Sequence, residues 1–542
     1  MATDPVCGSE FLERKETLSL LHKRYSSFKQ GYRQNMALVG SPGVGKSSAL
    51  CQFLSEIKDE TTIPIFFDIP QGSIELFIKR FMGSVLMSVL KINQKEIPWD
   101  VSQLIQMAKA FVPKTVVHMR GALKSVNQGH AEEGYKKVLE IPMILKSETG
   151  LQVVLVLDSF HYLDSLGLRN PFGAFGKQIM VDKDTMYLVA SSLPVKARSI
   201  FREKLNLLFG NFEILEVNHF DFESARRIID EKLNPFAVEP LLKNFLIQLT
   251  DAHPFYLITL LNRIREILMV QNKTEVTKDV LYQACVEEVL CSSGKIHQYF
   301  DSFYALEVKS KKFINPTQIL VGIALGHRKI SRLAKYVGVK LVDLKKGVQK
   351  LIDGEIIYKE GNLLLIPDAF LKFWLKQVVT IGFLGYETDI HRRKEYFLKQ
   401  LDLYFEEFSQ EATKDLSKRI EELFKGFQGE VINVGNERVV CPSFETVVSK
   451  PSNGRVFPVK AHSHKGAWIC QIAPKIIKED DIQTFLSDIK GQRVKIVKKI
   501  LISLKEIDQN AVLIAKNARI NIWDLKILNR LLDIYDRPKV IL

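Results

Sequence analysis

Cysteine is scarce in this chain of 542 residues, and no CxxC pair or histidine at metal-ligand spacing accompanies the cysteines that it has. The six are scattered along the sequence, at Cys7, Cys51, Cys285, Cys291, Cys441 and Cys470. Disulfide frameworks belong to short secreted chains, and zinc sites need closely spaced ligands. We therefore expect reduced thiols and no zinc site.

Long apolar runs are missing as well. The most apolar stretch, Val153–Leu157, is far shorter than the ~18 residues that a membrane-spanning helix needs. The chain opens with MATDPVCGSE, which has acids where a signal peptide has a basic head and an apolar run. Internal repeats and low-complexity tracts are absent too. We expect a cytoplasmic protein with no membrane partner.

Basic residues are in excess, with 76 lysines and arginines against 62 aspartates and glutamates and a net charge of +14. A surplus of positive charge favours a polyanionic partner. The distribution of the basic residues along the chain is stronger evidence for such a partner than the net charge itself.

The first ~250 residues alternate short apolar runs with helical patterns, which is typical of an α/β fold with a parallel sheet. The predicted strands are Asn35–Val39, Pro64–Ile69, Val153–Leu157, Met186–Ala190 and Phe212–Val217. The predicted helices between them include Ser48–Ile57 and Ile74–Leu90. From Phe220 to Val289 the pattern is wholly helical.

The strongest motif is Gly40-Ser41-Pro42-Gly43-Val44-Gly45-Lys46-Ser47-Ser48, which fits GxxxxGK[ST] between a predicted strand and a predicted helix. Glycines let the backbone curl until successive N–H groups point at phosphate oxygens, and the helix N-terminus adds partial positive charge. Lys46 would reach the β- and γ-phosphates, and Ser47 would hold Mg²⁺. The motif predicts a phosphate-binding loop (P-loop) for ATP with Mg²⁺.

A hydrophobic strand that ends in a carboxylate is the expected partner of such a loop. Val153–Leu157 followed by Asp158 supplies it, so Asp158 is predicted to hold Mg²⁺ and to act with Lys46 in catalysis. Many such ATPases carry a glutamate at the next position to polarise the attacking water. Here it is Ser159, which predicts slow hydrolysis unless another group substitutes.

Other polar residues near these strands have two interpretations each. His161 and Asp164 are the local candidates to replace the glutamate, or else surface polar residues. Ser191-Ser192 follows a predicted strand where a polar residue can sense the γ-phosphate. Arg198 and Arg202 are arginine-finger candidates, although ordinary surface charge is the interpretation that we favour.

Four stretches carry a family resemblance. They are FLERKE at Phe11–Glu16, VVLVLDSFHYL around Asp158, YLVASSLPVKARSIF around Ser191, and AHPFYL at Ala252–Leu257. They resemble the F-x-x-R-x-x-E/L box, strand-D-E-F-Q-Y-L, strand-GSS-helix and G-x-P-x-Y-L motifs of the archaeal-type ATPases, a branch of the AAA+/STAND P-loop proteins. The resemblance implies an adenine-side contact for Arg14 and a helical lid whose Pro254 closes over the nucleotide. Ser159 and Glu13 depart from the pattern, where the family has Glu and Gly.

The segment from Ile296 to Leu375 is predicted to contain a winged helix-turn-helix. Its helices are Ile319–Leu325, Lys329–Tyr336 and Leu341–Ile352, and its wing is the hairpin Ile356–Ile366. The basic residues are Lys309, Lys311, Lys312, Arg328, Lys329, Arg332, Lys335, Lys340, Lys345, Lys346 and Lys350. Because Asp343 is the only acid among them, we expect contact with DNA phosphates. A spacer between proteins is the alternative.

The last part is predicted to open with a charged helix through Leu423. Strands at Arg438–Cys441, Val456–Lys460, Ala467–Ile472 and Ala511–Ala515 and a helix at Ile522–Tyr535 follow. This order resembles a restriction-endonuclease-like domain, which often follows this type of ATPase. Such a nuclease needs an Asp on one strand and Glu-x-Lys on the next. Gln471 and Ala473 stand at the Glu and Lys positions, and Glu445, Glu422 and Lys475 are the remaining candidates, so cleavage is not expected. The basic stretches at 475–478 and 494–505 could still bind nucleic acid.

Four domains are therefore predicted: an ATPase core at 1–218, a helical lid at 219–295, a winged helix at 296–378 and an inactive nuclease-like domain at 379–542. We expect an ATP-dependent, DNA-associated switch with slow hydrolysis. A signalling or defence switch that oligomerises on ATP binding, with no direct DNA role, is the alternative, and a protein partner or homo-oligomer stays open.

Overall fold

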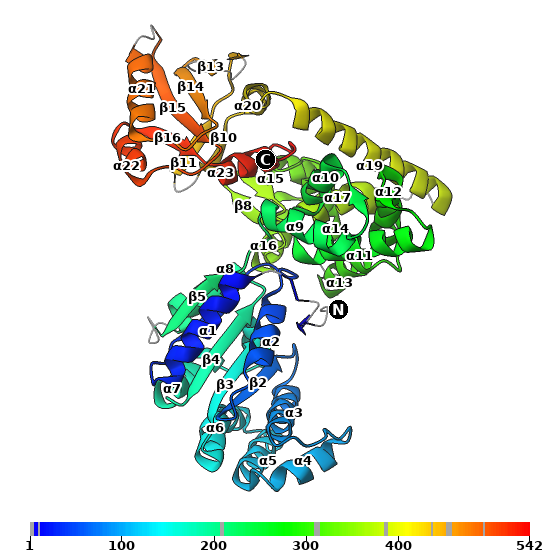
Figure 1. Cartoon of the computed structure of the whole chain (residues 1–542), viewed down its shortest axis with the longest axis vertical. Coiled ribbons are helices and arrows are strands. Elements are labelled where there is room, and N and C mark those ends of the chain that lie inside the picture. Colours follow the sequence, from blue (N-terminus) through cyan, green and yellow to red (C-terminus); the bar gives the residue numbers. More distant parts are fainter. Residues whose placement is uncertain are drawn as a thin grey trace. The chain divides into compact units, whose positions relative to one another are not determined.

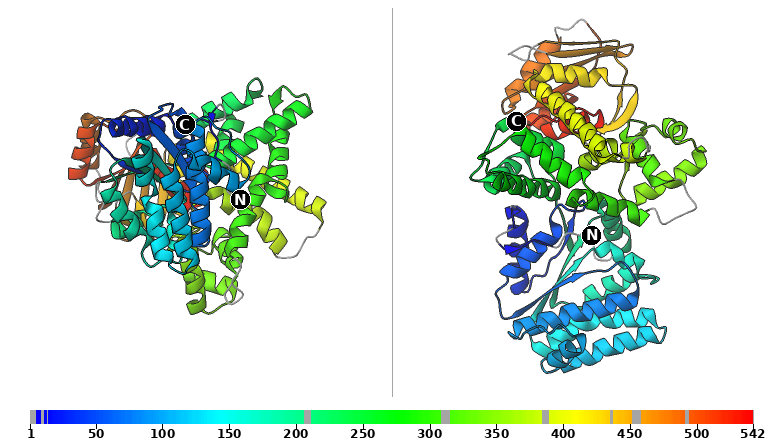
Figure 2. Two further views of the ribbon diagram at one scale, coloured as in Figure 1. Left: turned by 90° about the horizontal axis from the view of Figure 1, so that it is seen from below. Right: turned by 90° about the vertical axis from the view of Figure 1, so that its right-hand side faces the viewer.

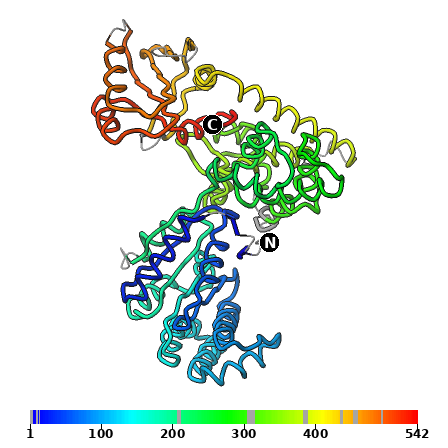
Figure 3. The backbone as a smooth tube through the Cα atoms, viewed as in Figure 1, coloured from blue at the N-terminus to red at the C-terminus, as the bar shows by residue number. Residues whose placement is uncertain are grey.

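The computed structural model describes residues 5–8, 11–12, 14–205, 211–307, 315–383, 389–434, 437–450, 458–490 and 494–541, which are coloured in Figure 3. The chain divides into two compact units. The first comprises Met1–Phe220 and His253–Phe255, and the second comprises Asp221–Ala252 and Tyr256–Leu542. The predicted boundary after residue 218 lies close to this division. The two further predicted boundaries fall inside the second unit and stay predictions.

The first unit is built on a five-stranded sheet, in which every strand pairs in parallel with its neighbours (Figure 1). The strand order is β2-β3-β4-β1-β5. The bounds are β1 (Asn35–Val39), β2 (Thr62–Asp68), β3 (Gln152–Asp158), β4 (Thr185–Ser191) and β5 (Phe212–Glu216). All five predicted strands are therefore present, and the sheet is parallel as predicted.

Helices cover both faces of this sheet (Figures 1 and 2), which is why β1, β3 and β4 are nearly continuous apolar runs. Alternate residues of a strand point to opposite faces. In β3, Val154 and Val156 join the core with α1 and α2, whereas Leu155 and Leu157 join the core with α3 to α7. The helices are α1 (Lys15–Lys29), α2 (Lys46–Glu56), α3 (Ile74–Ile92), α4 (Val101–Lys109), α5 (Pro113–Asn127), α6 (Ala131–Thr149), η2 (Phe160–Ser165), α7 (Pro171–Val181), α8 (Pro194–Ser199) and η3 (Ile200–Lys204).

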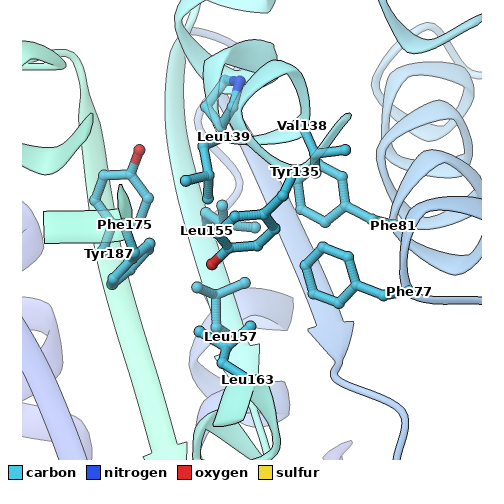
Figure 4. A pocket seen from close by; sticks show the side chains of 11 residues that line it. Phe77, Phe81, Tyr135, Val138, Leu139, Leu155, Leu157, Leu163, Phe175 and Tyr187 are labelled. Atoms are coloured by element: carbon cyan, nitrogen blue, oxygen red, sulfur yellow. The ribbon is translucent and has the colours of Figure 1, made fainter. Parts of the chain in front are cut away.

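Helices α4 to α6 form an insertion between β2 and β3 that the sequence did not predict. Their buried residues, such as Met119 and Ile141, belong to the same core as β3. A cavity of about 20 Å³ remains in this core, lined by apolar and aromatic side chains that include Phe77, Tyr135 and Leu157 (Figure 4). It has room for about one water and is a packing gap rather than a ligand site.

The second unit begins with a helical region. Its elements are α9 (Phe222–Leu233), β6 (Ala237–Val238), α10 (Pro240–Thr250), α11 (Pro254–Val270), β7 (Glu275–Val276), α12 (Lys278–Cys285), η5 (Val286–Leu290) and α13 (Lys295–Glu307). The prediction of a wholly helical lid is wrong in one detail, because β6 and β7 form a short parallel pair.

Three helices and a hairpin follow, in the order predicted for a winged helix-turn-helix. Helices α14 (Pro316–Ala324), α15 (Ile330–Val337) and α16 (Leu341–Asp353) pack on one another, and β8 (Tyr358–Glu360) pairs with β9 (Leu363–Leu365). We call this hairpin, residues 358–365, the wing. The identity of the segment as a winged helix stays a prediction. The chain continues through α17 (Ala369–Trp374), η6 (Leu375–Val379) and α18 (Thr380–Phe383).

A mixed five-stranded sheet, in the order β12-β13-β14-β15-β16, forms the last part of this unit. The first three strands pair antiparallel, and the last three pair in parallel. Helices α20 and α23 cover one face, and α21 and α22 cover the other. The bounds are α19 (Ile390–Thr413), α20 (Leu416–Lys425), β10 (Glu430–Val434), β11 (Glu437–Cys441), β12 (Thr446–Ser449), β13 (Val459–Ser463), β14 (Gly466–Ala473), α21 (Glu479–Lys490), β15 (Ile496–Ser503), α22 (Gln509–Asn517), β16 (Ile520–Trp523) and α23 (Leu525–Ile534).

Three predictions for this part are wrong. The predicted strand Ala511–Ala515 lies inside helix α22, because Asp508 accepts the N–H groups of Asn510 and Ala511 and caps a helix there. The helix predicted through Leu423 is two helices, since Asp415 caps α20 through the N–H of Ser417. The last helix begins at Leu525 instead of Ile522, because the residues before it form β16.

None of the helices in the described ranges is long and apolar enough to cross a membrane. The expected cytoplasmic location stays a prediction.

Candidate phosphate-binding site

The predicted P-loop connects the end of β1 to the start of α2. Gly43 (φ 75°) and Gly45 (φ 93°) adopt left-handed backbone conformations, which non-glycine residues rarely adopt. Gly40 is needed for a different reason, because a Cβ there would overlap the carbonyl oxygen of Val217. The first helical turn, at Lys46, Ser47 and Ser48, leaves N–H groups without a partner inside the helix. The loop therefore has the backbone that an anion cradle requires.

Lys46 is buried, with 4% of its surface exposed. Its Nζ donates to the carbonyl oxygens of Gly40 (2.9 Å) and Ser41 (2.8 Å), both in its own loop. Burial lowers the pKa of Lys46 to about 8, the charge of Asp158 opposes this shift, and the charge of Arg14 adds to it. The ammonium group is thus held inside the loop, where the charge of Asp158 offsets only part of the cost of burying it.

Asp158 ends β3 and is buried, with 8% of its surface exposed. One of its oxygens, Oδ1, accepts the backbone N–H of Ser159 at 2.7 Å. Ser47, in the first turn of α2, is half-buried. A hydroxyl and a carboxylate are the hard oxygen ligands that Mg²⁺ prefers, so both residue types fit the predicted metal.

The Arg14 side chain forms a hydrogen bond with the backbone of the P-loop. Its guanidinium donates to the carbonyl oxygens of Val44 (2.8 Å) and Asn218 (2.6 Å) and lies 4.7 Å from the centre of the Phe220 ring. The structure therefore brings Arg14 to the P-loop, while the adenine-side contact that the resemblance implied stays a prediction. Glu13 lies outside the described residues.

His253 also reaches the loop. The Nε2 atom of His253 is 2.9 Å from the carbonyl oxygen of Pro42, and a Cβ on Gly43 would come within 2.8 Å of the His253 ring. Pro254 follows directly and begins α11. Sequence reasoning named Pro254 but missed His253, whose position next to the matched proline was the only available signal.

Ser191, which ends β4, forms a hydrogen bond with the segment that follows β3. Ser191 is buried, and its Oγ is 3.0 Å from Nδ1 of His161. Burial lowers the pKa of His161 to about 4, and the charges of Lys196 and Lys46 add to this effect. His161 is therefore neutral at physiological pH and already bonded to Ser191.

The other candidates near this site are paired elsewhere. Asp164 forms ion pairs with Lys196 (3.5 Å) and Lys204 (2.8 Å). Arg198 pairs with Glu216, and Arg202 pairs with its neighbour Glu203 at 2.7 Å. These pairings agree with the favoured interpretation of both arginines as surface charge.

Helices α15 and α16, and Lys340 just before α16, carry exposed basic side chains. Arg332, Lys335, Lys340, Lys345 and Lys346 are exposed there, which is where predicted DNA contacts would lie. Lys309, Lys311 and Lys312, the first members of the predicted basic stretch, lie outside the described residues.

The wing packs against the last part of the chain. Leu363 and Leu365 belong to the same core as Phe424 and Trp523, and Glu360 accepts the N–H of Asn433 (2.6 Å) and pairs with Arg530. Arg328 and Lys329 also turn this way, toward Asp536 and Glu430. These two basic residues are therefore engaged within the protein.

The predicted nuclease positions hold no acidic cluster within the described residues. Gln471 is half-buried on β14, and its Oε1 atom has no hydrogen-bond partner there. Glu422 pairs with Lys414 and Arg537, while Glu445 is exposed. Across the described ranges, no three Asp, Glu, His or Cys side chains gather as a metal site would require.

The chain was compared with known proteins. No family model matches the sequence, and no curated protein matches it. Among solved structures, a Walker-type ATPase of Pyrococcus abyssi is 16% identical, with a TM-score of 0.47, over 69% of this chain and 99% of that one. The ORC2 protein of Aeropyrum pernix, in ADPNP–ADP complexes, is 14% identical, with a TM-score of 0.45, over 70% and 98%. The ORC1 protein of the same organism, in complex with DNA, is 11% identical, with a TM-score of 0.39, over 70% and 95%.

These scores are too low to carry conclusions about function. The fold of the first unit is assigned from its own geometry instead. A five-stranded parallel sheet, with GxxxxGKS between β1 and α2 and a carboxylate at the end of β3, matches a P-loop NTPase fold.

Proposed function

We propose that this protein binds ATP with Mg²⁺ at the P-loop and acts as an ATP-dependent switch associated with DNA. The P-loop amides and Lys46 would hold the phosphates, and Ser47 and Asp158 would hold Mg²⁺. Bound Mg²⁺ supplies neutralisation of the phosphate charge. Because Ser159 stands where a water-polarising glutamate is common, we propose slow hydrolysis.

One observation carries the nucleotide proposal. Lys46 is buried in a glycine loop at a helix N-terminus, close enough to the Asp158 carboxylate for the two charges to interact. Both hydrogen bonds of Lys46 go to backbone carbonyl oxygens. A phosphate would give this ammonium group a far better partner, because charge-assisted hydrogen bonds are about twice as strong as neutral ones.

Equilibrium binding tests this proposal. Lys46→Ala should weaken ATP binding about 100-fold or more, since it removes charge-assisted hydrogen bonds to phosphate. Lys58→Ala is a matched control, because Lys58 is exposed beyond the end of the same helix α2. Titration of both variants with a fluorescent ATP analogue and Mg²⁺ decides the matter. Equal affinity in Lys46→Ala and Lys58→Ala would refute the site.

The DNA part of the proposal rests on the exposed basic side chains of α15 and α16. Duplex binding there would be salt-dependent, since each phosphate neutralised releases counterions. The wing cannot serve in this contact as long as it packs against β10 and α23. The DNA contact is therefore proposed for the helices alone.

The packed wing also favours a second candidate, a switch whose winged helix serves assembly within the protein. Such a switch would oligomerise on ATP binding and ignore DNA. Sedimentation of the full chain with and without ATP, and with and without duplex DNA, separates the two. ATP-driven oligomers together with DNA binding no stronger than background would favour the second candidate.

A further inference from the structure

Asp68 is an acidic residue beside the carboxylate that is proposed to hold Mg²⁺. It ends β2, the edge strand next to β3, and its register partner is Asp158. The backbone of the two strands stays joined just beyond, because the N–H of Ile69 donates to the carbonyl oxygen of Asp158 at 3.1 Å. Asp68 is exposed, whereas its neighbours on both sides, Phe67 and Ile69, are buried. Asp68 therefore lies at the carboxyl ends of the parallel strands, and the P-loop follows the same end of β1.

Ser159 turns toward this carboxylate. Its backbone is left-handed (φ 54°), and its N–H is fixed by Asp158. The Ser159 side chain lies within hydrogen-bonding reach of the Asp68 carboxylate. Desolvation by the surrounding chain raises the pKa of Asp68, hydrogen bonding to Ser159 opposes the rise, and the charge of Asp158 adds to it. An ionised Asp68 carboxylate would accept the hydroxyl proton of Ser159.

The two candidates named from the sequence are worse placed. His161 is buried, and its Nδ1 is bonded to Ser191. Asp164 is neutralised by Lys196 and Lys204. Of these three groups, Asp68 is the one in contact with the residue that occupies the glutamate position.

We propose that Asp68 and Ser159 together replace the missing glutamate as the water-positioning group of ATP hydrolysis. Asp68 accepts the Ser159 hydroxyl proton, which leaves the lone pairs of Ser159 Oγ to accept a hydrogen bond from the attacking water. Asp68 is a positioning residue that acts through Ser159. This inference rests on the proposed ATP site and names a further part of it.

The step requires no additional reactant. The water oxygen forms a bond to the γ-phosphorus, the bond from that phosphorus to the bridging oxygen of ADP breaks, and both protons of the water leave on the released phosphate. Phosphoryl transfer depends mostly on positioning and electrostatics, so a group that orients water is sufficient and a strong base is not needed. A hydroxyl oriented by a carboxylate can do this with less reach than a glutamate, which agrees with slow turnover.

The test uses the full chain and the variants Asp68→Asn and Ser159→Ala. Asp184→Asn is the matched control. Asp184 is exposed and lies just before β4, at the amino end of the strands, whereas Asp68 lies at their carboxyl end. Single-turnover hydrolysis should slow about 10- to 100-fold in both Asp68→Asn and Ser159→Ala, as expected when a reacting group loses its orientation. It should stay unchanged in Asp184→Asn.

Binding provides a readout that does not depend on turnover. Wild type and Asp68→Asn should bind a non-hydrolysable ATP analogue equally, within about twofold. ADP with aluminium fluoride, which mimics the transition state, should bind more weakly to Asp68→Asn than to wild type. In the variant Ser159→Glu, which supplies the missing carboxylate directly, adding Asp68→Asn should cost less than about twofold.

The failures of the two proposals are distinguishable. Absence of ATP binding in wild type would refute the ATP site itself. Normal ATP binding with equal hydrolysis in wild type and Asp68→Asn would overturn only the present inference. Normal binding with no hydrolysis at all in wild type would overturn it as well. A slowing in Asp68→Asn that persists unchanged in the Ser159→Glu background would show a structural role instead.

Discussion

Lys46 lies in an environment that disfavours its charge. A lysine ammonium in this setting loses most of its hydration, and two backbone carbonyl oxygens replace only part of it. The charge of Asp158 opposes the resulting fall in the pKa of Lys46 without cancelling it. Phosphate binding would relieve this by supplying anionic acceptors. The site is therefore electrostatically prepared for an anion.

A pH dependence of ATP binding follows from this environment. The pKa of Lys46 in the free protein is lowered to about 8, and bound phosphate would raise it because an adjacent anion favours the charged form. ATP binding should therefore take up a proton above pH 8, and affinity should fall as the pH rises further. Calorimetric titration at about pH 9, one unit above that pKa, in two buffers of different ionisation enthalpy, measures this uptake.

Lys58→Ala should show the same proton uptake as wild type. If ATP binds at this pH without proton uptake, Lys46 is not the group that meets the phosphate.

Single residues of the site were predictable where the signal is local in sequence. Lys46, Ser47 and Asp158 come from motifs that a strand or helix carries by itself. Asp68 and His253 were not predicted, because each meets the site through the fold, far along the chain from its partner. The register of β2 against β3 is fixed by the whole sheet and leaves no mark near Asp158.

At the scale of elements, the sequence predicts the hairpin of the wing but not the surface against which the wing packs. Gly361 lies at its tip with φ 59°, and a Cβ there would overlap the carbonyl oxygen of Val431 in β10. Leu363 and Leu365 are buried in the core that β14 and α23 share. The hairpin is a structural contact inside the second unit.

Gly361→Ala should loosen this packing. The substitution adds an overlap with Val431 to the ~1–2 kcal/mol that a left-handed alanine costs. Hydrogen exchange of the full chain should then speed up in peptides from β8, β9, β10 and β11. Gly338→Ala is the control, because Gly338 has φ 74° and open space around its Cβ position. It should leave those peptides protected, and equal exchange in both variants would contradict the packing role.

The helices α15 and α16 carry the proposed DNA contact. Lys345→Ala with Lys346→Ala should weaken duplex binding and lower the slope of log affinity against log salt by about 1 for each phosphate that the protein no longer neutralises. Lys394→Ala with Lys399→Ala in α19 removes the same charge from positions elsewhere in the chain. Fluorescence anisotropy over a range of salt concentrations compares the two pairs. An equal effect from both pairs would mean that net charge alone drives binding.

Elements with strong periodicity were predicted well, and ambiguous apolar runs were not. The strands β1, β3 and β4 of the first sheet are packed between helices on both faces and form nearly continuous apolar runs. Ala511–Ala515 reads in the same way, yet it forms a helix, because the Asp508 cap and the i, i+4 spacing of buried Ala511 and Ala515 suit a helix against β15. Short apolar runs do not distinguish the two structures.

At the scale of the whole molecule, the C-terminal residues hold the second unit together. Lys539 pairs with Asp251 at the end of α10, and its backbone N–H donates to Gln248 Oε1 at 2.9 Å. Val540 and Asn529 exchange two hydrogen bonds, and Arg419 donates to the carbonyl oxygen of Pro538. These few residues thus connect α10, α20 and α23.

Lys539→Ala should open this connection locally. It leaves the largely buried carboxylate of Asp251 without this ion-pair partner, at a cost of about 1–3 kcal/mol. Hydrogen exchange should speed up in peptides from α10 and α23 and stay unchanged in those from the sheet β1–β5. Lys526→Ala, at a position of α23 away from this ion pair, is the control. No change in α10 would show that the ion pair contributes little.

The division of the chain near residue 220 lies close to the point where the alternation of predicted strands and helices stops, although His253–Phe255 also belongs to the first unit. The insertion α4–α6 and the mixed sheet β12–β16 were harder to predict. The insertion shares its core with β3 and does not form a core by itself. In the mixed sheet, β12 is short and β15 contains lysines near one end, so their sequences do not show the apolar run of a buried strand. Both depend on long-range packing.

A structure of the full chain with Mg²⁺ and a non-hydrolysable ATP analogue tests the central claim most directly. We predict the triphosphate in the loop from Gly40 to Ser48, with Lys46 moved from the carbonyl oxygens of Gly40 and Ser41 onto the phosphates, and Mg²⁺ beside Ser47 and Asp158. An analogue bound elsewhere, with Lys46 still bonded to its own loop, would contradict the claim.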